Sequence, residues 1–170
     1  MIQFERCSND HDLAMVSLFL LENRHELHPS FTTLDMVSLI YSYATQGQFL
    51  QVLDSANRVI GAAVYYHGTP DQQFENREVA FVDIAVFERE IRGTRAFLNG
   101  LEYMINHIAK SHPEVEEVRF VAYADNTYVC KLYSKFMDVN HSREGKLGKE
   151  IIFSQKINNI STFLKRFNKI

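Results

Sequence analysis

The stretch from Val79 to Lys110 constrains the fold most, because it joins two different hydrophobic periods. Val79 to Phe87 is almost continuously apolar and is interrupted only by Asp83, a pattern typical of a strand covered on both faces. From Ala96 onward the apolar residues recur at helical spacing, which predicts one apolar stripe. The members of this stripe are Phe97, Leu101, Met104, Ile105 and Ile108. We therefore predict a buried strand, a tight charged turn and a long helix.

The turn, EREIRGTR, places cations where a helix already carries partial positive charge. Arg92 and Arg95 bracket the expected helix start, and each costs a few tenths to ~1 kcal/mol there unless an anion binds. Gly93 has no Cβ, so a ligand could approach the backbone closely. The alternative is that both arginines pair with Glu88 and Glu90 in water. The turn alone leaves both interpretations open.

Composition restricts the class of protein. The 170 residues are 46% hydrophobic and 23% charged, as in an ordinary globular chain, and the net charge of −3 argues against a dedicated nucleic-acid binder. Cys7 and Cys130 indicate no disulfide framework. The N-terminus lacks the form of a signal peptide, and the apolar run from Leu13 to Leu21 is too short to span a bilayer. We expect a cytoplasmic protein without nucleic-acid or membrane partners.

The remaining periodicities predict a strand, two helices, three strands, a helix, a strand, a helix, two strands and a helical tail. The expected ranges are 2–7, 10–26, 33–46, 48–54, 58–67, 79–87, 96–110, 117–124, 127–137, 139–144, 150–157 and 160–170. On the second helix, the residues expected to face inward are Leu34, Val37, Ile40, Tyr41 and Ala44. An α/β fold with one mixed sheet and helices on both faces accommodates this order.

We expect a single domain over residues 1–157, followed by an amphipathic tail over 158–170. The apolar face of the tail must dock on another surface. Its own domain is the first candidate, and a second subunit, which would make a homodimer, is the next. The apolar residues of this face are Ile160, Phe163, Leu164, Phe167 and Ile170.

We predict no metal site. His25 and His28 are three residues apart, but no further ligands follow at a known zinc spacing. The preferred interpretation of this pair is a solvated helix end.

Two segments resemble the GNAT superfamily of acyl-CoA-dependent N-acetyltransferases. EREIRGTRAFLNGLEYM is similar to the loop that binds the pyrophosphate of acyl-CoA, typically P-x-Y-R-G-x-G-x-G/A before a long helix, with Arg92 and Gly93 matching. DNTYVCKLYSKF is similar to the N-x-x-A-x-x-L-Y-x-K segment, with Asn126 and Tyr133 in register. The resemblance implies the GNAT-like fold, a mostly antiparallel mixed sheet of six to seven strands, and acetyl-CoA as cosubstrate. It implies cofactor contacts from Val86, Phe87, Arg92, Gly93, Thr94, Arg95, Ala96 and Asn126.

The chain also departs from the family pattern. Arg95 replaces the middle glycine of the loop, and Phe97 replaces its last small residue. Met137 and Asp138 replace the usual Gly-Phe after the second segment. The ring of Phe97 would crowd a pyrophosphate if it pointed at the loop, although its period places it on the apolar stripe. We interpret the loop as altered but still able to bind.

The resemblance implies that Tyr133 protonates the leaving thiolate, whereas its position alone fits an aromatic core residue equally well. A base must first take a proton from the amine, whose pKa is ~10. Asp83 is the carboxylate within the buried strand and is the first candidate, with Glu75 and Glu78 weaker. The alternative for Asp83 is a structural acid bonded to a neighbouring element.

Two functions follow. The first is transfer of an acetyl group from acetyl-CoA to a primary amine of a small molecule or a protein. The second is a catalytically silent binding or scaffold protein in which the cofactor slot has closed. In the family the acceptor is bound between the first two helices and by variable loops. In this chain those regions carry His28, Phe31, His67 and Phe74.

Overall fold

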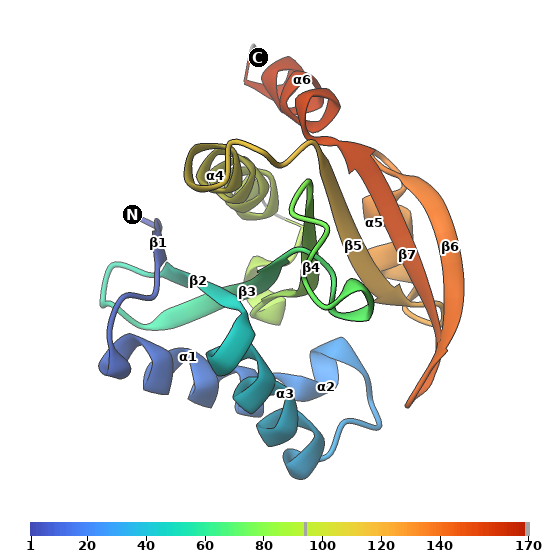
Figure 1. Cartoon of the computed structure of the whole chain (residues 1–170). Helices are drawn as coiled ribbons and strands as arrows, with labels where there is room; N and C mark the ends of the chain where they lie inside the picture. Colours follow the sequence, from blue (N-terminus) through green and yellow to red (C-terminus); the bar gives the residue numbers. More distant parts are fainter. Residues whose placement is uncertain (94, 169–170) are drawn as a thin grey trace. The chain divides into compact units, whose positions relative to one another are not determined.

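The structure is a computed structural model that describes residues 1–93 and 95–168. The chain forms two compact units. The first contains Met1–Tyr65 and Ile84–Gly100, and the second contains Tyr66–Asp83 and the chain from Leu101 onward. Seven strands form one mixed sheet in the order β1-β2-β3-β4-β5-β7-β6, which confirms the predicted class of sheet (Figure 1). The division of the sequence into one domain and a tail stays a prediction.

The elements follow the expected order (Figure 1). Their bounds are β1 Gln3–Arg6, α1 Asp10–Glu22, α2 Arg24–Leu27, α3 Thr33–Gln46, β2 Gln48–Leu53, β3 Val59–His67, η1 Pro70–Gln72, β4 Val79–Phe87, η2 Arg89–Ile91, α4 Arg95–Ser111, β5 Glu117–Tyr123, α5 Thr127–Tyr133, β6 Asp138–Gly145, β7 Gly148–Lys156 and α6 Ile157–Phe167. No helix of the described ranges is both long enough and apolar enough to cross a bilayer.

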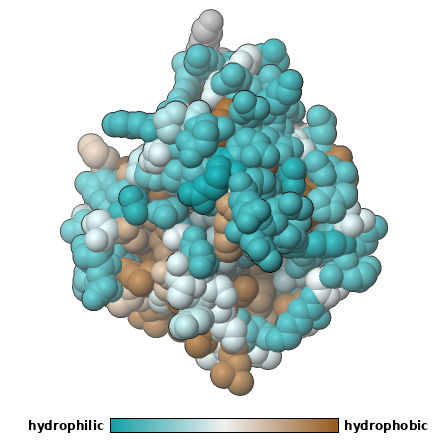
Figure 2. All heavy atoms as spheres, viewed as in Figure 1, coloured by the Kyte–Doolittle hydropathy of each residue, from teal (hydrophilic) through white to brown (hydrophobic). Residues whose placement is uncertain are grey.

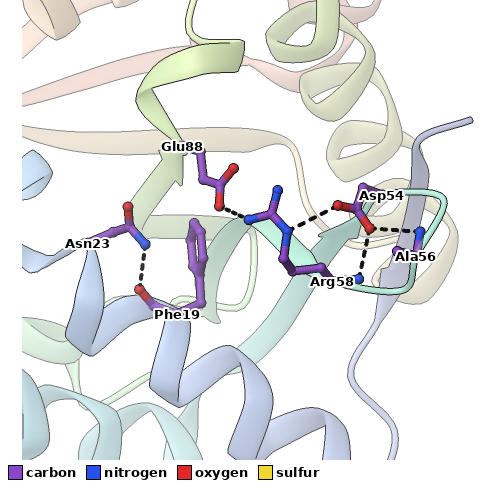
Figure 3. A network of polar contacts seen from close by, with 6 residues as sticks. All are labelled: Phe19, Asn23, Asp54, Ala56, Arg58 and Glu88. Atoms are coloured by element: carbon purple, nitrogen blue, oxygen red, sulfur yellow. Dashed lines mark hydrogen bonds and ion pairs between the residues drawn. The ribbon is translucent and has the colours of Figure 1, made fainter.

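In the first unit, β1, β2 and β3 form an antiparallel ladder. The helix predicted to run to residue 26 is instead two helices, α1 and α2. Asn23 separates them, and its side-chain amide donates to the Phe19 carbonyl at 2.9 Å (Figure 3). A side chain that bonds the preceding turn competes with continuation of the helix.

Helix α3 begins with a complete capping box between Thr32 and Asp35. Its predicted inward face is wrong: Met36 and Tyr43 are buried, and Ile40 is partly buried. The helix has apolar residues on more than one face, so the pattern did not select the face that packs. The exposed apolar residues of α3 and of the neighbouring α1 are Leu34, Val37, Tyr41, Met15 and Leu18. Figure 2 shows apolar surface at its lower edge, where Figure 1 places α1 and α3.

Phe87, the last residue of β4, determines how the end of this strand packs. Its ring lies so close to Gly61 of β3 that a Cβ there would be 2.7 Å from Phe87 Cδ1. A Cβ at Gly100 of α4 would lie 3.1 Å from Phe87 Cζ. The two glycines therefore allow one aromatic ring to fill the space between a strand and the first turns of α4. This packing positions both ends of the turn at residues 88–94.

In the second unit, β4 and β5 pair in parallel from Val79–Glu117 to Val82–Phe120, and β5, β7 and β6 continue in antiparallel pairs. Helix α5 ends at Tyr133, four residues earlier than predicted. The reason is local: the Ser134 hydroxyl donates to the Cys130 carbonyl at 2.8 Å and the chain turns there.

Helix α6 docks within the second unit. The chain's own domain was the first candidate for the surface that this tail covers. Ile157, Ile160 and Leu164 are buried, and the Phe163 ring lies 5.6 Å from that of Phe136. Residue 170, the last member of the predicted apolar face, lies outside the described residues.

We predict that Gly61→Ala lowers the free energy of unfolding by about 1–3 kcal/mol, because the new methyl group overpacks Phe87. Urea denaturation measures this. Gly100→Ala is the matched control: its contact is looser, and alanine gains about 1 kcal/mol of helix propensity, so the net change should be smaller. Adding Phe87→Leu should recover part of the loss in Gly61→Ala. Unchanged stability in Gly61→Ala would contradict the packing described above.

Candidate functional site

The turn between β4 and α4 is built around Gly93. Its φ is +83°, a left-handed conformation that glycine adopts without strain. Apart from Gly93 itself and its two chain neighbours, no atom of the described residues lies within 4 Å of the position that a Cβ would occupy. A ligand can therefore approach this backbone, as predicted, from the side where other residues carry a side chain.

Arg92, a predicted anion ligand, pairs with Glu26 of α2, with 2.5 Å between Nη2 and Oε2. Arg89 reaches the other oxygen of the same carboxylate at 3.2 Å. Glu88, at the start of the turn, pairs with Arg58 (Figure 3). The Glu26 carboxylate lies outside the turn, whereas the alternative interpretation of the turn named Glu88 and Glu90 as partners. This partner of Arg92 comes from 66 residues earlier, so no local pattern could have shown it.

Arg95, the first residue of α4, is exposed. Within residues 1–93 and 95–168, no carboxylate lies within ion-pair distance of its guanidinium group. This cation at a helix N-terminus is thus balanced by nothing that the structure describes, which is the electrostatic situation that an anion relieves. Thr94, the other predicted ligand between Gly93 and Arg95, lies outside the described residues.

The apolar residues that were predicted to contact the cofactor are less accessible than Arg95. Val86 and Ala96 are buried, and Phe87 is half-buried. Phe97 is also half-buried. The stripe expected beyond it on α4 is confirmed, with each member at most 4% exposed: Leu101, Met104, Ile105 and Ile108.

Asn126 caps α5: its side-chain oxygen accepts from the Val129 N–H at 3.2 Å, as predicted for its structural role. Tyr133, at the other end of α5, is 3% exposed. Its ring packs at 4.9 Å from Phe120 and 5.7 Å from Phe153. Within the described residues its hydroxyl makes no hydrogen bond. The ring of Tyr133 is thus a core residue, and its role as a proton donor stays a prediction.

Burial, and secondarily Cys130, hold the pKa of Tyr133 above its ordinary value, so the phenol keeps its proton at neutral pH. Burial likewise raises the pKa of the Cys130 thiol, whose sulfur lies 3.4 Å from the Tyr123 carbonyl. A protonated thiol in this setting is a packing group and not a nucleophile.

Asp83 is half-buried in β4. Burial, followed by the charge of Asp83, raises the pKa of Tyr66, which places this carboxylate in the electrostatic environment of a buried phenol. Glu75 and Glu78, the weaker candidates for a base, are exposed. Of the three carboxylates, Asp83 is the one partly removed from water.

The expectation of a solvated helix end at the first histidine pair is wrong for His28, which is buried. Its Nδ1 accepts from the Ser30 N–H at 3.0 Å and so organises the loop after α2. His25 Nε2 lies 3.1 Å from the Phe31 carbonyl. Both rings thus have local backbone partners.

We predict that Glu26→Gln lowers the free energy of unfolding by about 1 kcal/mol, because a half-buried carboxylate with two arginine partners becomes neutral. Glu22→Gln, at an exposed position with no ion pair in the described chain, is the matched control and should be neutral. Urea denaturation at low and high salt measures the difference. A loss no larger than that of the control would mean that the pairing contributes nothing to stability.

No family model matches the sequence, and no curated protein matches it either. Solved structures do match. An acetyltransferase of the GNAT family from Streptococcus pneumoniae has a TM-score of 0.63 at 16% identity, with 92% of this chain and 99% of that chain covered. The aminoglycoside acetyltransferase AAC(6′)-Ib, solved with coenzyme A and kanamycin, has a TM-score of 0.70 at 16% identity, with 95% and 98% covered.

A third similar structure is spermidine N-acetyltransferase from Vibrio cholerae, solved with CoA and spermine. Its TM-score is 0.65 at 10% identity, with 94% of this chain and 98% of that chain covered. These identities are too low to carry a substrate, but the coverage leaves no major part of either chain unmatched. The fold of this chain is that of the GNAT acetyltransferases.

Proposed function

We propose that the protein is an N-acetyltransferase that moves an acetyl group from acetyl-CoA to a primary amine of a small molecule or a protein. The observation that carries this proposal is the open, positive-φ turn at Gly93, with Arg95 two residues later at the start of helix α4 and without a carboxylate partner among the residues that the structure describes. This turn coincides with the segment that resembles the family's pyrophosphate loop. The similar structures solved with CoA support the choice of cosubstrate.

In this proposal the diphosphate accepts hydrogen bonds from backbone N–H groups after Gly93 and is neutralised by Arg95. Arg92 contributes less charge than the family pattern implies, because Glu26 already neutralises it. The loop is therefore altered in its electrostatics more than in its backbone. Val86 and Phe87 contribute the strand end beside which the acyl group would lie, and Asn126 a further contact through the start of α5.

Acetyl-CoA supplies the activated acyl group as a thioester. Asp83 takes the proton that the amine must lose before attack, through a bridging water. It is half-buried, whereas Glu75 and Glu78 are exposed, and for this reason it is the preferred candidate. Its alternative role, as a structural acid near Tyr66, stays open.

Tyr133 gives its hydroxyl proton to the sulfur that leaves when the C–S bond breaks. A phenol with a raised pKa is always protonated and ready to donate. It is also a weak acid, so it acts only on a sulfur whose own basicity is raised by desolvation in the same site. The side chain is 3% exposed, and its hydroxyl, which bonds no residue that the structure describes, is available to a ligand.

The second candidate is a binding or scaffold protein. The observation that favours it is the Glu26 carboxylate, which occupies two guanidinium groups of the turn and leaves the diphosphate with fewer charges. Binding of CoA separates the two candidates before any activity is sought.

The acceptor amine stays unassigned. Of the four residues expected in acceptor-binding regions, His28, Phe31 and His67 are buried, and Phe74 is half-buried. They form no acidic surface of the kind a polyamine would require. The cytoplasmic setting, the homodimer and the absence of nucleic-acid and membrane partners stay predictions.

We predict that CoA at about 100 times its Kd raises the melting temperature by about 5–10 °C, since binding to the native state alone contributes about 2.7 kcal/mol. Arg95→Ala should reduce this shift, whereas Arg166→Ala, at an exposed position on α6, should not. The shift with ligand is compared with the same variant without ligand, because removing a cation from a helix start stabilises the free protein slightly. No shift at millimolar CoA would remove the enzyme proposal.

We predict that Tyr133→Phe lowers kcat by about 100-fold or more and leaves the CoA Kd nearly unchanged, because only the proton donor is lost. The ring stays in its aromatic cluster, so the variant should fold. Thiol release from acetyl-CoA with a panel of amines measures the rate. Tyr128→Phe, on the exposed side of the same helix, is the control. Wild-type turnover in Tyr133→Phe would exclude this tyrosine as the acid.

A further inference from the structure

A cluster of metal-ligating side chains lies in the second unit and has no role in the proposed reaction. His67 is the last residue of β3, whereas His112 and Glu114 follow the end of α4. One ligand atom from each of the three lies within 4.8 Å of the others. His67 is buried, His112 is half-buried and Glu114 is exposed, so the cluster opens to solvent on the glutamate side.

The distances around His67 resemble those of a coordination shell. Its Nε2 lies 3.1 Å from Glu114 Oε1 and 2.9 Å from the Arg77 carbonyl oxygen. Ligands about 2.0–2.2 Å from a tetrahedral zinc ion are about 3.3–3.6 Å from one another, so these atoms need to separate by only a few tenths of an ångström to admit the ion. A proton on Nε2 now bridges these groups, and a metal ion could replace it with small movements of exposed side chains.

We propose that His67, His112 and Glu114 bind a divalent transition metal of the zinc type, with the Arg77 carbonyl as an additional oxygen ligand. Two imidazoles and a carboxylate are a borderline nitrogen and oxygen donor set, which suits zinc, cobalt or nickel better than magnesium or calcium. The exposed side of the cluster leaves room for a water ligand.

The rings of His67 and His112 are close enough for one nitrogen of each to reach the same ion. The two rings lie 4.1 Å apart and are tilted by 35°, so a modest rotation turns one nitrogen of each toward a shared ion. The His112 N–H bonds the Ile108 carbonyl at 2.8 Å, which places this residue at the C-terminus of α4, where partial negative charge favours a cation.

One charge opposes binding. The Arg77 guanidinium donates to the His67 carbonyl at 2.9 Å and stays beside the cluster. It fixes the backbone of His67 while it repels a second cation. We therefore expect weaker affinity than in a closed structural zinc site, and a stable fold without metal.

Titration of tag-free protein with Zn²⁺ by calorimetry, and with Co²⁺ by visible absorption, tests the proposal. We expect one equivalent of metal per chain and ligand-field bands of a four- or five-coordinate cobalt ion. Glu114→Gln and His112→Ala should each weaken Zn²⁺ binding by more than the about 10- to 100-fold that loss of an outer-shell partner costs. His141→Ala removes an exposed histidine outside the cluster and should bind as wild type does.

Circular dichroism establishes that each variant is folded, and His112 and Glu114 are chosen because neither is buried. Absence of one-to-one binding in the wild type would overturn the proposal. Equal loss of affinity in His141→Ala would also overturn it, because the metal would then be binding to surface histidines in general. None of these measurements involves CoA, so their outcome is independent of the proposed acetyl transfer.

Discussion

The packing of one aromatic ring against two glycines determines the geometry on which the candidate site depends. Phe87 fills the space between Gly61 of β3 and Gly100 of α4, and a methyl group at Gly61 would already overlap the ring. Because protein interiors are close-packed, this contact leaves little freedom for the end of β4 or the first turns of α4. The turn that joins them must close the gap in seven residues, 88–94, and Gly93 supplies the left-handed conformation that this closure uses.

Ion pairs then restrain the turn, and they have two opposite effects on a ligand. Arg58 holds Glu88 at one end, and Glu26 holds Arg89 and Arg92 in the middle. A restrained turn loses less entropy when it binds an anion. The same Glu26 carboxylate neutralises charge that a diphosphate would otherwise meet. The choice between an acetyltransferase and a catalytically silent protein of the same fold thus depends on whether the backbone amides and Arg95 alone can bind the diphosphate.

The second unit has separate chemistry. Tyr133 combines a ring in an aromatic cluster with a hydroxyl that bonds no described residue, so the ring can contribute to the core while the hydroxyl takes the proposed role of proton donor. The cluster of His67, His112 and Glu114 shares no residue with this aromatic cluster and consists of metal-ligating side chains. A metal ion bound there would link the end of β3 to the segment after α4 and would take no part in acyl transfer.

The sequence alone determined the order of the elements, the hairpins, the cap at Asn126, the stripe of α4 and the amphipathic character of α6. These features depend on periodicity and on hydrogen bonds between residues that are close in sequence, so a short stretch of sequence is enough to predict them. It also indicated the glycine turn, because the residue types there are unusual for a helix start. The tertiary structure alone decided the inward face of α3, the pairing of Arg92 with Glu26 and the meeting of His67 with His112. In each case tertiary packing selects one partner among several with the same chemistry. Residues far apart in sequence carry no local signal of that selection.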